Sequence, residues 1–154
     1  MPKAPAHRVR RKPPFFRPVP LRHRRDGWSE LRQCAFLAEL YCTGSVTVAA
    51  RRVGVSRMGA YRLRRRAGAE SFAFAWDYIF VPPGRGKIAR PGTDWRKVTN
   101  PTLVERVETG WVQPVIYAGR FTAIRRKPDN SALLRVLRRY DAIVASVRAE
   151  AAKA

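Results

Sequence analysis

The residues with the most direct chemical potential are five arginines in the run SRMGAYRLRRR, residues 56–66. A guanidinium group is planar and stays charged at physiological pH. It can donate two parallel hydrogen bonds to a phosphate or to the O6 and N7 atoms of guanine. Arginines gathered on one short helix therefore predict a surface that binds a polyanion, and nucleic acid is the first candidate.

The residues around this run predict two short helices that meet at a tight turn. Ser45 or Thr47 can cap a first helix that ends near Val53. Gly54 follows, and glycine adopts the left-handed backbone of a turn without strain. Ser56 can then cap a second helix that runs to about residue 66. The turn would hold the arginine-bearing helix against its predecessor.

The apolar positions decide which side of the second helix faces solvent. Ala60 and Leu63 lie three residues apart and form its inner face, and Ala50 is small enough for the two helices to cross closely. The remaining positions lie on the outer face or at its ends. They are the candidate binding residues Ser56, Arg57, Met58, Tyr61, Arg62, Arg64, Arg65 and Arg66.

These candidates divide by the contact each could make. Early residues of a helix lying in the major groove reach base edges, so Arg57 and Arg62 are assigned to guanine and Tyr61 to a thymine methyl or a phosphate. The run 64–66 is assigned to phosphate, which supplies affinity rather than sequence preference.

One stretch also resembles a known family. GSVTVAARRVGVSRMGAYRLRRRAGAESFAFAWD is similar to the homeodomain-like helix-turn-helix of phage terminase small subunits and of related bacterial and transposase-type DNA-binding proteins. The shared features are the entry GSVTxAA, the turn VGVSR, the helix AYRxR and the following FAxAWD. The resemblance covers about residues 28–80. It implies double-stranded DNA as partner, in transcriptional regulation or in phage DNA packaging beside a large terminase subunit.

Composition agrees with a polyanionic partner. The chain has 154 residues and a formal net charge of +21, from 32 Lys and Arg against 11 Asp and Glu. Such a protein attracts nucleic acid first and an anionic membrane surface second. No run of 18 apolar residues exists, so we expect no membrane span.

The chain divides into four predicted regions, in a mostly α-helical fold. Residues 1–27 hold six prolines and nine Lys and Arg, which predicts a disordered basic arm that either follows DNA or only aids solubility. Residues 28–80 form the helix-turn-helix domain. Residues 81–100 are a linker with three prolines and three glycines, and residues 101–154 hold a short helix, a β-hairpin and a C-terminal helix.

Apolar stripes place the remaining elements. A helix from Ser29 to about Cys42 and another from Glu70 to Phe80 should flank the helical pair, with Trp76 in the core behind it. Strands 111–117 and 120–126 should form a hairpin, which needs a packing partner, and the last helix is the natural one. The hairpin is either structural or a wing that touches DNA through Arg120, Arg125, Arg126 and Lys127.

The last helix, capped by Asp129, carries a seam that either packs on its own domain or joins two copies in a homo-oligomer. The seam consists of Leu133, Leu137, Tyr140, Val144 and Val147.

Catalytic signals are weak. Both histidines, His7 and His23, fall in the basic arm, and there is no CxxC pair, P-loop or GxSxG motif. The carboxylates do not cluster. Cys34 and Cys42 stand on one predicted helix, about 12 Å apart in rise, which is too far for a disulfide. We expect no enzyme, no metal and no cofactor, and a reducing, cytoplasmic setting beside host or phage DNA.

Two other functions fit the same composition. A structural RNA-binding protein would be equally basic and aromatic, although the deep, narrow groove of A-form RNA excludes a helix. A protein-interaction adaptor would use the C-terminal helix.

Overall fold

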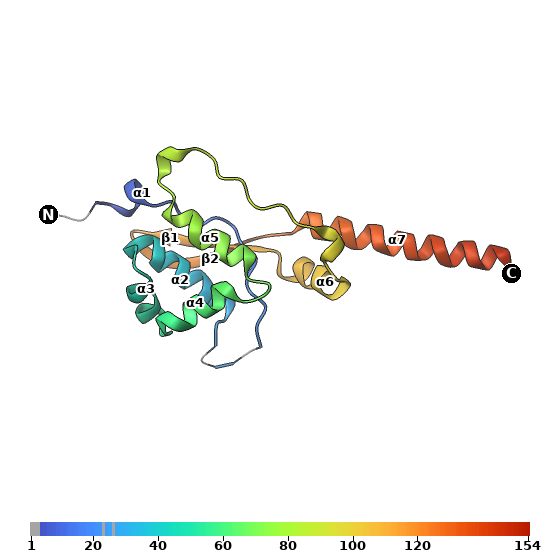
Figure 1. Cartoon of the computed structure of the whole chain (residues 1–154), viewed down its shortest axis with the longest axis horizontal. Helices are drawn as coiled ribbons and strands as arrows, with labels where there is room; N and C mark the ends of the chain where they lie inside the picture. Colours follow the sequence, from blue (N-terminus) through green and yellow to red (C-terminus); the bar gives the residue numbers. More distant parts are fainter. Residues whose placement is uncertain (1–3, 23, 26) are drawn as a thin grey trace. The chain divides into compact units, whose positions relative to one another are not determined.

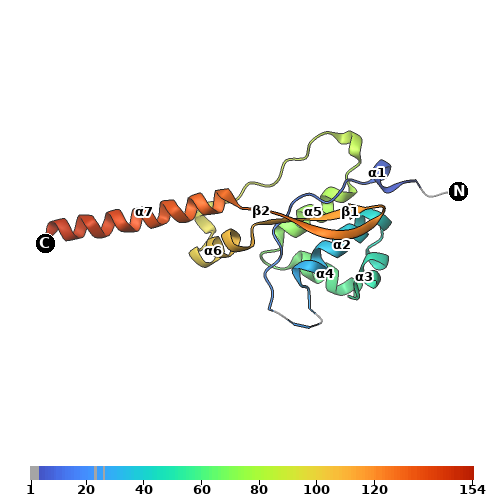
Figure 2. The ribbon, with the colours of Figure 1, turned by 180° about the vertical axis from the view of Figure 1, so that it is seen from behind.

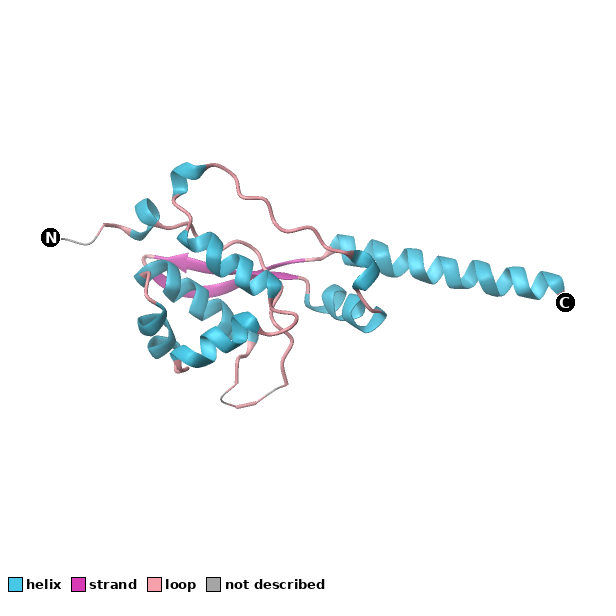
Figure 3. Ribbon diagram, viewed as in Figure 1, coloured by secondary structure: helices cyan, strands magenta, loops and turns pink. Residues whose placement is uncertain are grey.

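The computed structural model describes residues 4–22, 24–25 and 27–154. Over these residues the protein is mostly helical, with one β-hairpin followed by a long helix, as predicted (Figure 3). The chain forms two compact units: the first joins the residues up to 91 with 111–126, and the second joins 92–110 with 127–154. In the described part of the chain no helix is both long enough and apolar enough to cross a membrane.

Four helices form the frame of the first unit. They are α2 (Glu30–Thr43), α3 (Val46–Val53), α4 (Arg57–Arg65) and α5 (Glu70–Phe80), close to the predicted bounds. The hydroxyls of Ser29, Ser45 and Ser56 accept hydrogen bonds from the first turns of α2, α3 and α4, which leaves fewer helical N–H groups unsatisfied. Gly44 and Gly54 end α2 and α3 with φ of 69° and 82°, which other residues reach only with strain.

Aromatic rings fill the space between these helices. Phe36 of α2 lies 5.0 Å from Trp76 of α5 and 6.2 Å from Phe72, measured between ring centroids. Both phenylalanines are fully buried, and Trp76 is nearly so. Each buried aromatic of this size stabilises the fold by roughly 1.5–3 kcal/mol relative to an exposed one. The prediction that Trp76 belongs to the core behind α4 is confirmed.

The N-terminal segment is ordered over its described residues, so the prediction of a long disordered arm over residues 1–27 is wrong; residues 1–3, 23 and 26 lie outside the described residues. After a short helix, α1 (Ala6–Val9), the chain runs extended across the first unit, beside α5 and the hairpin (Figures 1 and 2). Phe16 is fully buried against Phe72, and Pro13 and Val19 are buried as well. The arm prediction weighed prolines and charge and overlooked the apolar residues between them. We call residues 10–21 the strap.

Two arginines of the strap close the C-terminal ends of helices. Arg10 donates from Nε to the carbonyl of Tyr41, at 2.6 Å, and from Nη2 to Cys42 in the last turn of α2. Arg11 donates to the carbonyls of residues 81–83 just after α5. A helix C-terminus exposes unpaired carbonyls and is the negative end of the helix macrodipole. A guanidinium group there donates hydrogen bonds to the carbonyls and places a positive charge next to the dipole. Gly44 makes room, because a Cβ there would come 2.5 Å from Arg10.

The hairpin pairs β1 (Trp111–Tyr117) with β2 (Arg120–Lys127) across a two-residue turn. Ala118 and Gly119 both have positive φ, 50° and 74°, which matches the right-handed twist of the strands. On the other edge of β1, Phe16 exchanges both backbone hydrogen bonds with Val112. The next pair in that antiparallel register would be residues 14 and 114. Both are proline and lack an N–H, so the pairing stops at one bridge.

The packing partner of the hairpin is α2, not the last helix as predicted. Val112 is fully buried in the core that α2 shares with the strap, and Ile116, Phe121 and Ile124 pack against the same core. At the far end of the hairpin, Arg126 of β2 forms an ion pair with Glu30 in the first turn of α2. The hairpin therefore belongs to the same unit as the helices that precede it in the chain by some 30 residues or more.

The second unit consists of α6 (Asn100–Thr109) packed on α7 (Asn130–Lys153), preceded by a 3₁₀ turn at Trp95–Lys97. Thr99 caps α6 and Asp129 caps α7, as its sequence position predicted. Leu103 of α6 and Ala132 of α7 are fully buried. The seam predicted on α7 is not covered by its own unit over most of its length: Leu133, Leu137, Tyr140 and Val147 are all exposed.

Candidate nucleic-acid interface

Helices α3 and α4 meet at a corner built from small residues. Ala49 and Ala50 of α3 are buried, as are Ala60 and Leu63 of α4. The corner is fixed by the backbone N–H of Val55, which donates to the carbonyl of Ala50 at 3.0 Å across the left-handed glycine. The predicted inner face of α4, Ala60 and Leu63, is therefore confirmed. The opposite side of the helix is its outer face.

Most of the predicted binding residues lie exposed on α4 or at its ends. Ser56 and Met58 at the start of the helix are exposed, Met58 to 59%. The four arginines Arg57, Arg62, Arg65 and Arg66 are also exposed. Among the described residues, none of these four guanidinium groups forms a hydrogen bond or an ion pair. Their donors are available to a ligand.

Tyr61 and Arg64 are held against the protein instead. The Tyr61 ring lies 5.4 Å from Trp76 and is half-buried, with Arg57 placed 5.8 Å above its centroid. Arg64 donates both terminal N–H groups to the two carboxylate oxygens of Asp77, at 2.9 and 3.1 Å. Its guanidinium also lies 5.0 Å from the Trp76 centroid.

Arg64 therefore ties α4 to α5. The sequence assigned Arg64 to phosphate together with its neighbours, but in the structure its fork is already filled by a carboxylate. The partner Asp77 stands 13 residues later on a different helix, beyond the reach of spacing rules for a single helix.

A second basic segment, part of the predicted basic arm, begins and ends near α4, a position that the sequence did not predict. Near the start of α4, Nε1 of Trp28 would lie 3.8 Å from a Cβ on Gly59, and beyond its end Pro20 would lie 4.0 Å from a Cβ on Gly68. Both ends of the loop between Pro20 and Trp28 therefore lie near α4. The loop carries the exposed side chains Arg22, Arg24 and Arg25; His23 and Asp26 lie outside the described residues.

The charge around α4 is strongly one-sided. Residues 43–66 contain seven arginines and no acidic residue. Within the described chain, two of these arginines are paired from neighbouring helices: Arg52 with Glu39 at 2.9 Å, and Arg64 with Asp77. The outer face of α4 keeps its positive charge, which attracts an anion over a Debye length of about 8 Å at physiological salt.

The hairpin arginines are partly engaged. Arg126 pairs with Glu30, and Arg125 donates to the side-chain oxygen of Gln113 at 3.4 Å. Arg120 is exposed beside the turn. Two of the basic side chains that a DNA-contacting wing would need are therefore already engaged within the protein. The wing role of the hairpin stays a prediction.

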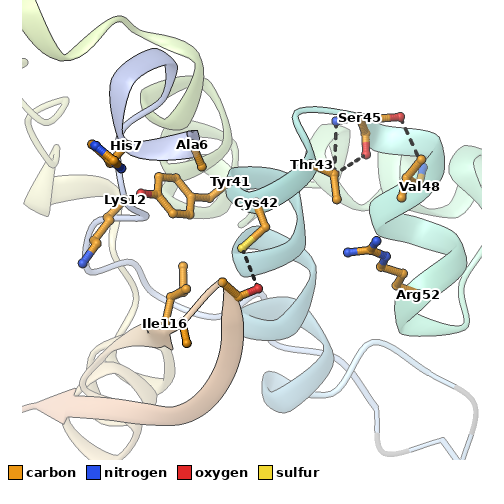
Figure 4. Close-up of a pocket in the computed structure, with 12 residues that line it drawn as sticks. Ala6, His7, Lys12, Tyr41, Cys42, Thr43, Ser45, Val48, Arg52 and Ile116 are labelled. Carbon is orange, nitrogen blue, oxygen red and sulfur yellow. Dashed lines mark hydrogen bonds between the residues drawn. The ribbon is translucent and has the colours of Figure 1, made fainter. Parts of the chain in front are cut away.

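The first unit also has an open cleft of about 850 Å³ between the N-terminal segment, the end of α2, α3 and the hairpin turn (Figure 4). Lys12 and Arg52 give its lining a positive character. The Cys42 thiol donates to the Gly119 carbonyl at 3.3 Å, and burial raises the pKa of this thiol. A protonated thiol is a poor nucleophile. The cleft therefore offers cations but no activated group.

In the described part of the chain no three His, Cys, Asp or Glu side chains gather at one place. Cys34 and Cys42 are both free thiols on α2. Burial, with a smaller contribution from Glu30, raises the pKa of Cys34 to about 12. Cys34 is therefore a small core residue at neutral pH.

Comparisons with protein-family models, with curated proteins and with solved structures give no match for this chain.

Proposed function

We propose that the protein binds duplex DNA with the α3–α4 pair acting as a helix-turn-helix and α4 entering the major groove. The observation that carries the proposal is the outer face of α4, where four exposed arginines stand on a corner of buried alanines. An α-helix fits the major groove of B-form DNA in width and depth. The N-cap at Ser56 places Arg57 in the first turn, the part of such a helix that reaches base edges.

The proposed contacts divide into two kinds. Arg57 and Arg62 read guanine. Arg65 and Arg66, near the end of α4, bind phosphate together with Arg22, Arg24 and Arg25 of the neighbouring loop. Arg64 acts indirectly, by fixing α4 on α5 through Asp77. Regulation of transcription and phage DNA packaging beside a large terminase subunit are the two uses proposed, and both require this contact.

The test begins by selecting bound duplexes from a random DNA pool and measuring Kd for a selected and a scrambled sequence. Arg57→Ala and Arg62→Ala should each weaken binding to the selected duplex by about 1–3 kcal/mol and binding to the scrambled one by less. Arg65→Ala and Arg66→Ala should weaken both alike, each lowering the slope of log Kd against log salt by about 0.9.

Arg85→Ala is the matched control, because it removes one exposed arginine from the loop after α5. If Arg85→Ala weakens binding as much as Arg62→Ala, net charge alone drives association and α4 is not the reading helix. Equal losses on both duplexes for Arg57→Ala and Arg62→Ala would remove the base-reading role. A structured RNA that displaces the selected duplex at equal concentration would favour RNA as the ligand.

A further inference from the structure

The exposed side of α7 carries a seam with the spacing of a coiled coil. Leu133, Leu137, Tyr140, Val144 and Val147 follow one another at alternating intervals of four and three residues. Side chains at this spacing form one stripe along a helix and pack into the matching stripe of a partner helix. Tyr140 is 64% exposed and Val147 is 61% exposed, so the stripe faces solvent over most of α7.

The cations of α7 stand mostly away from this seam. Arg135 lies over the Trp95 ring, 5.3 Å from its centroid, and Arg139 donates to the Trp95 carbonyl and to Asn100. These contacts belong to the side of α7 that receives α6, where Ala132 is buried. The helix thus has one side satisfied within its own unit and another, apolar side without cover.

We propose that this seam binds a second copy of the same chain, with the two α7 helices antiparallel. The row of residues bordering the seam on one side contains Leu134, Asp141 and Arg148. Asp141 and Arg148 are seven residues, two helical turns, apart. In an antiparallel symmetric pair each such row faces the same row of the other copy. When the two-fold axis passes near residues 144 and 145, Asp141 of each copy lies opposite Arg148 of the other, which gives two ion pairs across the seam; Leu133 then lies beyond the overlap of the two helices.

A parallel pair would lack this complementarity. It would set the row with Asp141 and Arg148 against the opposite border row, which holds Val136, Ile143 and Glu150. Asp141 and Arg148 would then face Val136 and Ile143 of the partner, and neither charge would be matched.

The first experiment is sedimentation velocity of the full chain over a range of concentrations, without DNA. We expect a dimer, and Leu137→Glu/Val147→Glu should raise the dimer Kd by about 30-fold or more. Glutamate forms helices well and lowers the net positive charge, so lost association cannot come from a larger net charge of the two copies. Tyr117→Glu is the matched control, because Tyr117 is 77% exposed in the hairpin and should leave the Kd unchanged.

Helical circular dichroism equal to the parent chain would show that α7 persists in the variants. A parent chain that sediments as a monomer up to roughly 100 μM, or a double glutamate variant that associates like the parent, would overturn the proposal.

Charge reversal tests the orientation with residues that keep α7 helical. Asp141→Arg places two arginines opposite each other and should weaken the dimer by about tenfold. Asp141→Arg/Arg148→Asp restores opposite charges across the seam and should recover the parent Kd. An unchanged Kd in the single variant, or no recovery in the double one, would overturn the antiparallel arrangement. These measurements contain no DNA. A result that overturns the dimer therefore does not contradict the proposed DNA binding by α4.

Discussion

The strap and α4 are both rich in arginine, yet they use it in different ways. In the strap, Arg10 and Arg11 donate hydrogen bonds to backbone carbonyls at the ends of α2 and α5. On α4, Arg57 and Arg62 point their donors at solvent. The first pair of guanidinium groups holds the fold together, and the second is available to a ligand. Arginine content alone does not separate the two, whereas the partners of each side chain do.

Arg64 lies between these two cases. It belongs to the arginine run of α4 by sequence and to the structural group by contact, since Asp77 and Trp76 occupy it. Its side chain is 24% exposed while that of Asp77 is 63% exposed, so water weakens the pair. The difference between holding the fold and binding a ligand therefore varies residue by residue, even within one helix.

The strongest test of this comparison removes the anchor of the strap. Phe16→Ala should lower the free energy of unfolding by about 3–5 kcal/mol, because Phe16 is fully buried against α5 and β1. Urea unfolding followed by circular dichroism measures it. Tyr117→Ala, at an exposed aromatic, should change the same quantity by less than about 0.5 kcal/mol. Equal stability of both variants would show that the strap is a loose arm after all.

The second test replaces one arginine of each region by alanine. Arg10→Ala should lower the free energy of unfolding by about 1–3 kcal/mol, since it leaves the carbonyls of Tyr41 and Cys42 without their charged donor. It should not change the salt dependence of DNA binding.

Arg62→Ala should do the reverse. Its stability should stay within about 0.5 kcal/mol of the parent chain, and DNA binding should weaken. Unfolding curves and a salt titration of Kd on both variants decide the matter. If Arg10→Ala and Arg62→Ala change stability equally, or change DNA binding equally, the division into structural and ligand-binding arginines is wrong.

The smallest effect concerns Cys34, which is fully buried on α2. The pKa of Cys34 is about 12 in the folded chain and near 9 when unfolded. Between these values the unfolded state has lost the thiol proton and the folded state keeps it. Stability should therefore fall as pH rises above about 9, by up to roughly 1.4 kcal/mol per pH unit for this group.

Cys34→Ala should flatten that slope in urea titrations between pH 8 and roughly 10.5. Tyr41 and Cys42 also have raised pKa values, caused first by burial, and will contribute a remaining slope. An identical pH dependence with and without Cys34 would mean that water reaches this face of α2.

The helices of the first unit were predictable because their signals are local. Serine caps, glycine stops and apolar spacing all act within one or two turns, and they place α2 to α5 and the hairpin within about two residues. The outer face of α4 followed in the same way from Ala60 and Leu63. The position of the candidate site could thus be predicted largely from the roughly 20 residues that form it.

The strap, the partner of Arg64 and the packing of the hairpin were not predictable, because each depends on a contact distant in sequence. Proline and charge outweighed Phe16 and Val19 in the composition of residues 1–27, although these two residues supply the burial that orders the segment. The basic loop beside α4 was hidden for the same reason. The position of its arginines depends on the path of the strap, which brings Pro20 near Gly68.

The pairing of the strap with β1 has a consequence for the newly made chain. The Gln113 side chain donates to the carbonyl of Pro13, a contact that spans 100 residues. At ribosomal rates of about 5–20 residues per second, the strap waits roughly 5–20 s before its partner strand is synthesised. During that interval Phe16 has no neighbouring strand, and the emerging segment is open to chaperones and proteases. Docking of the strap on β1 therefore comes late in the synthesis of the chain, and protease resistance of residues 10–21 would mark its completion.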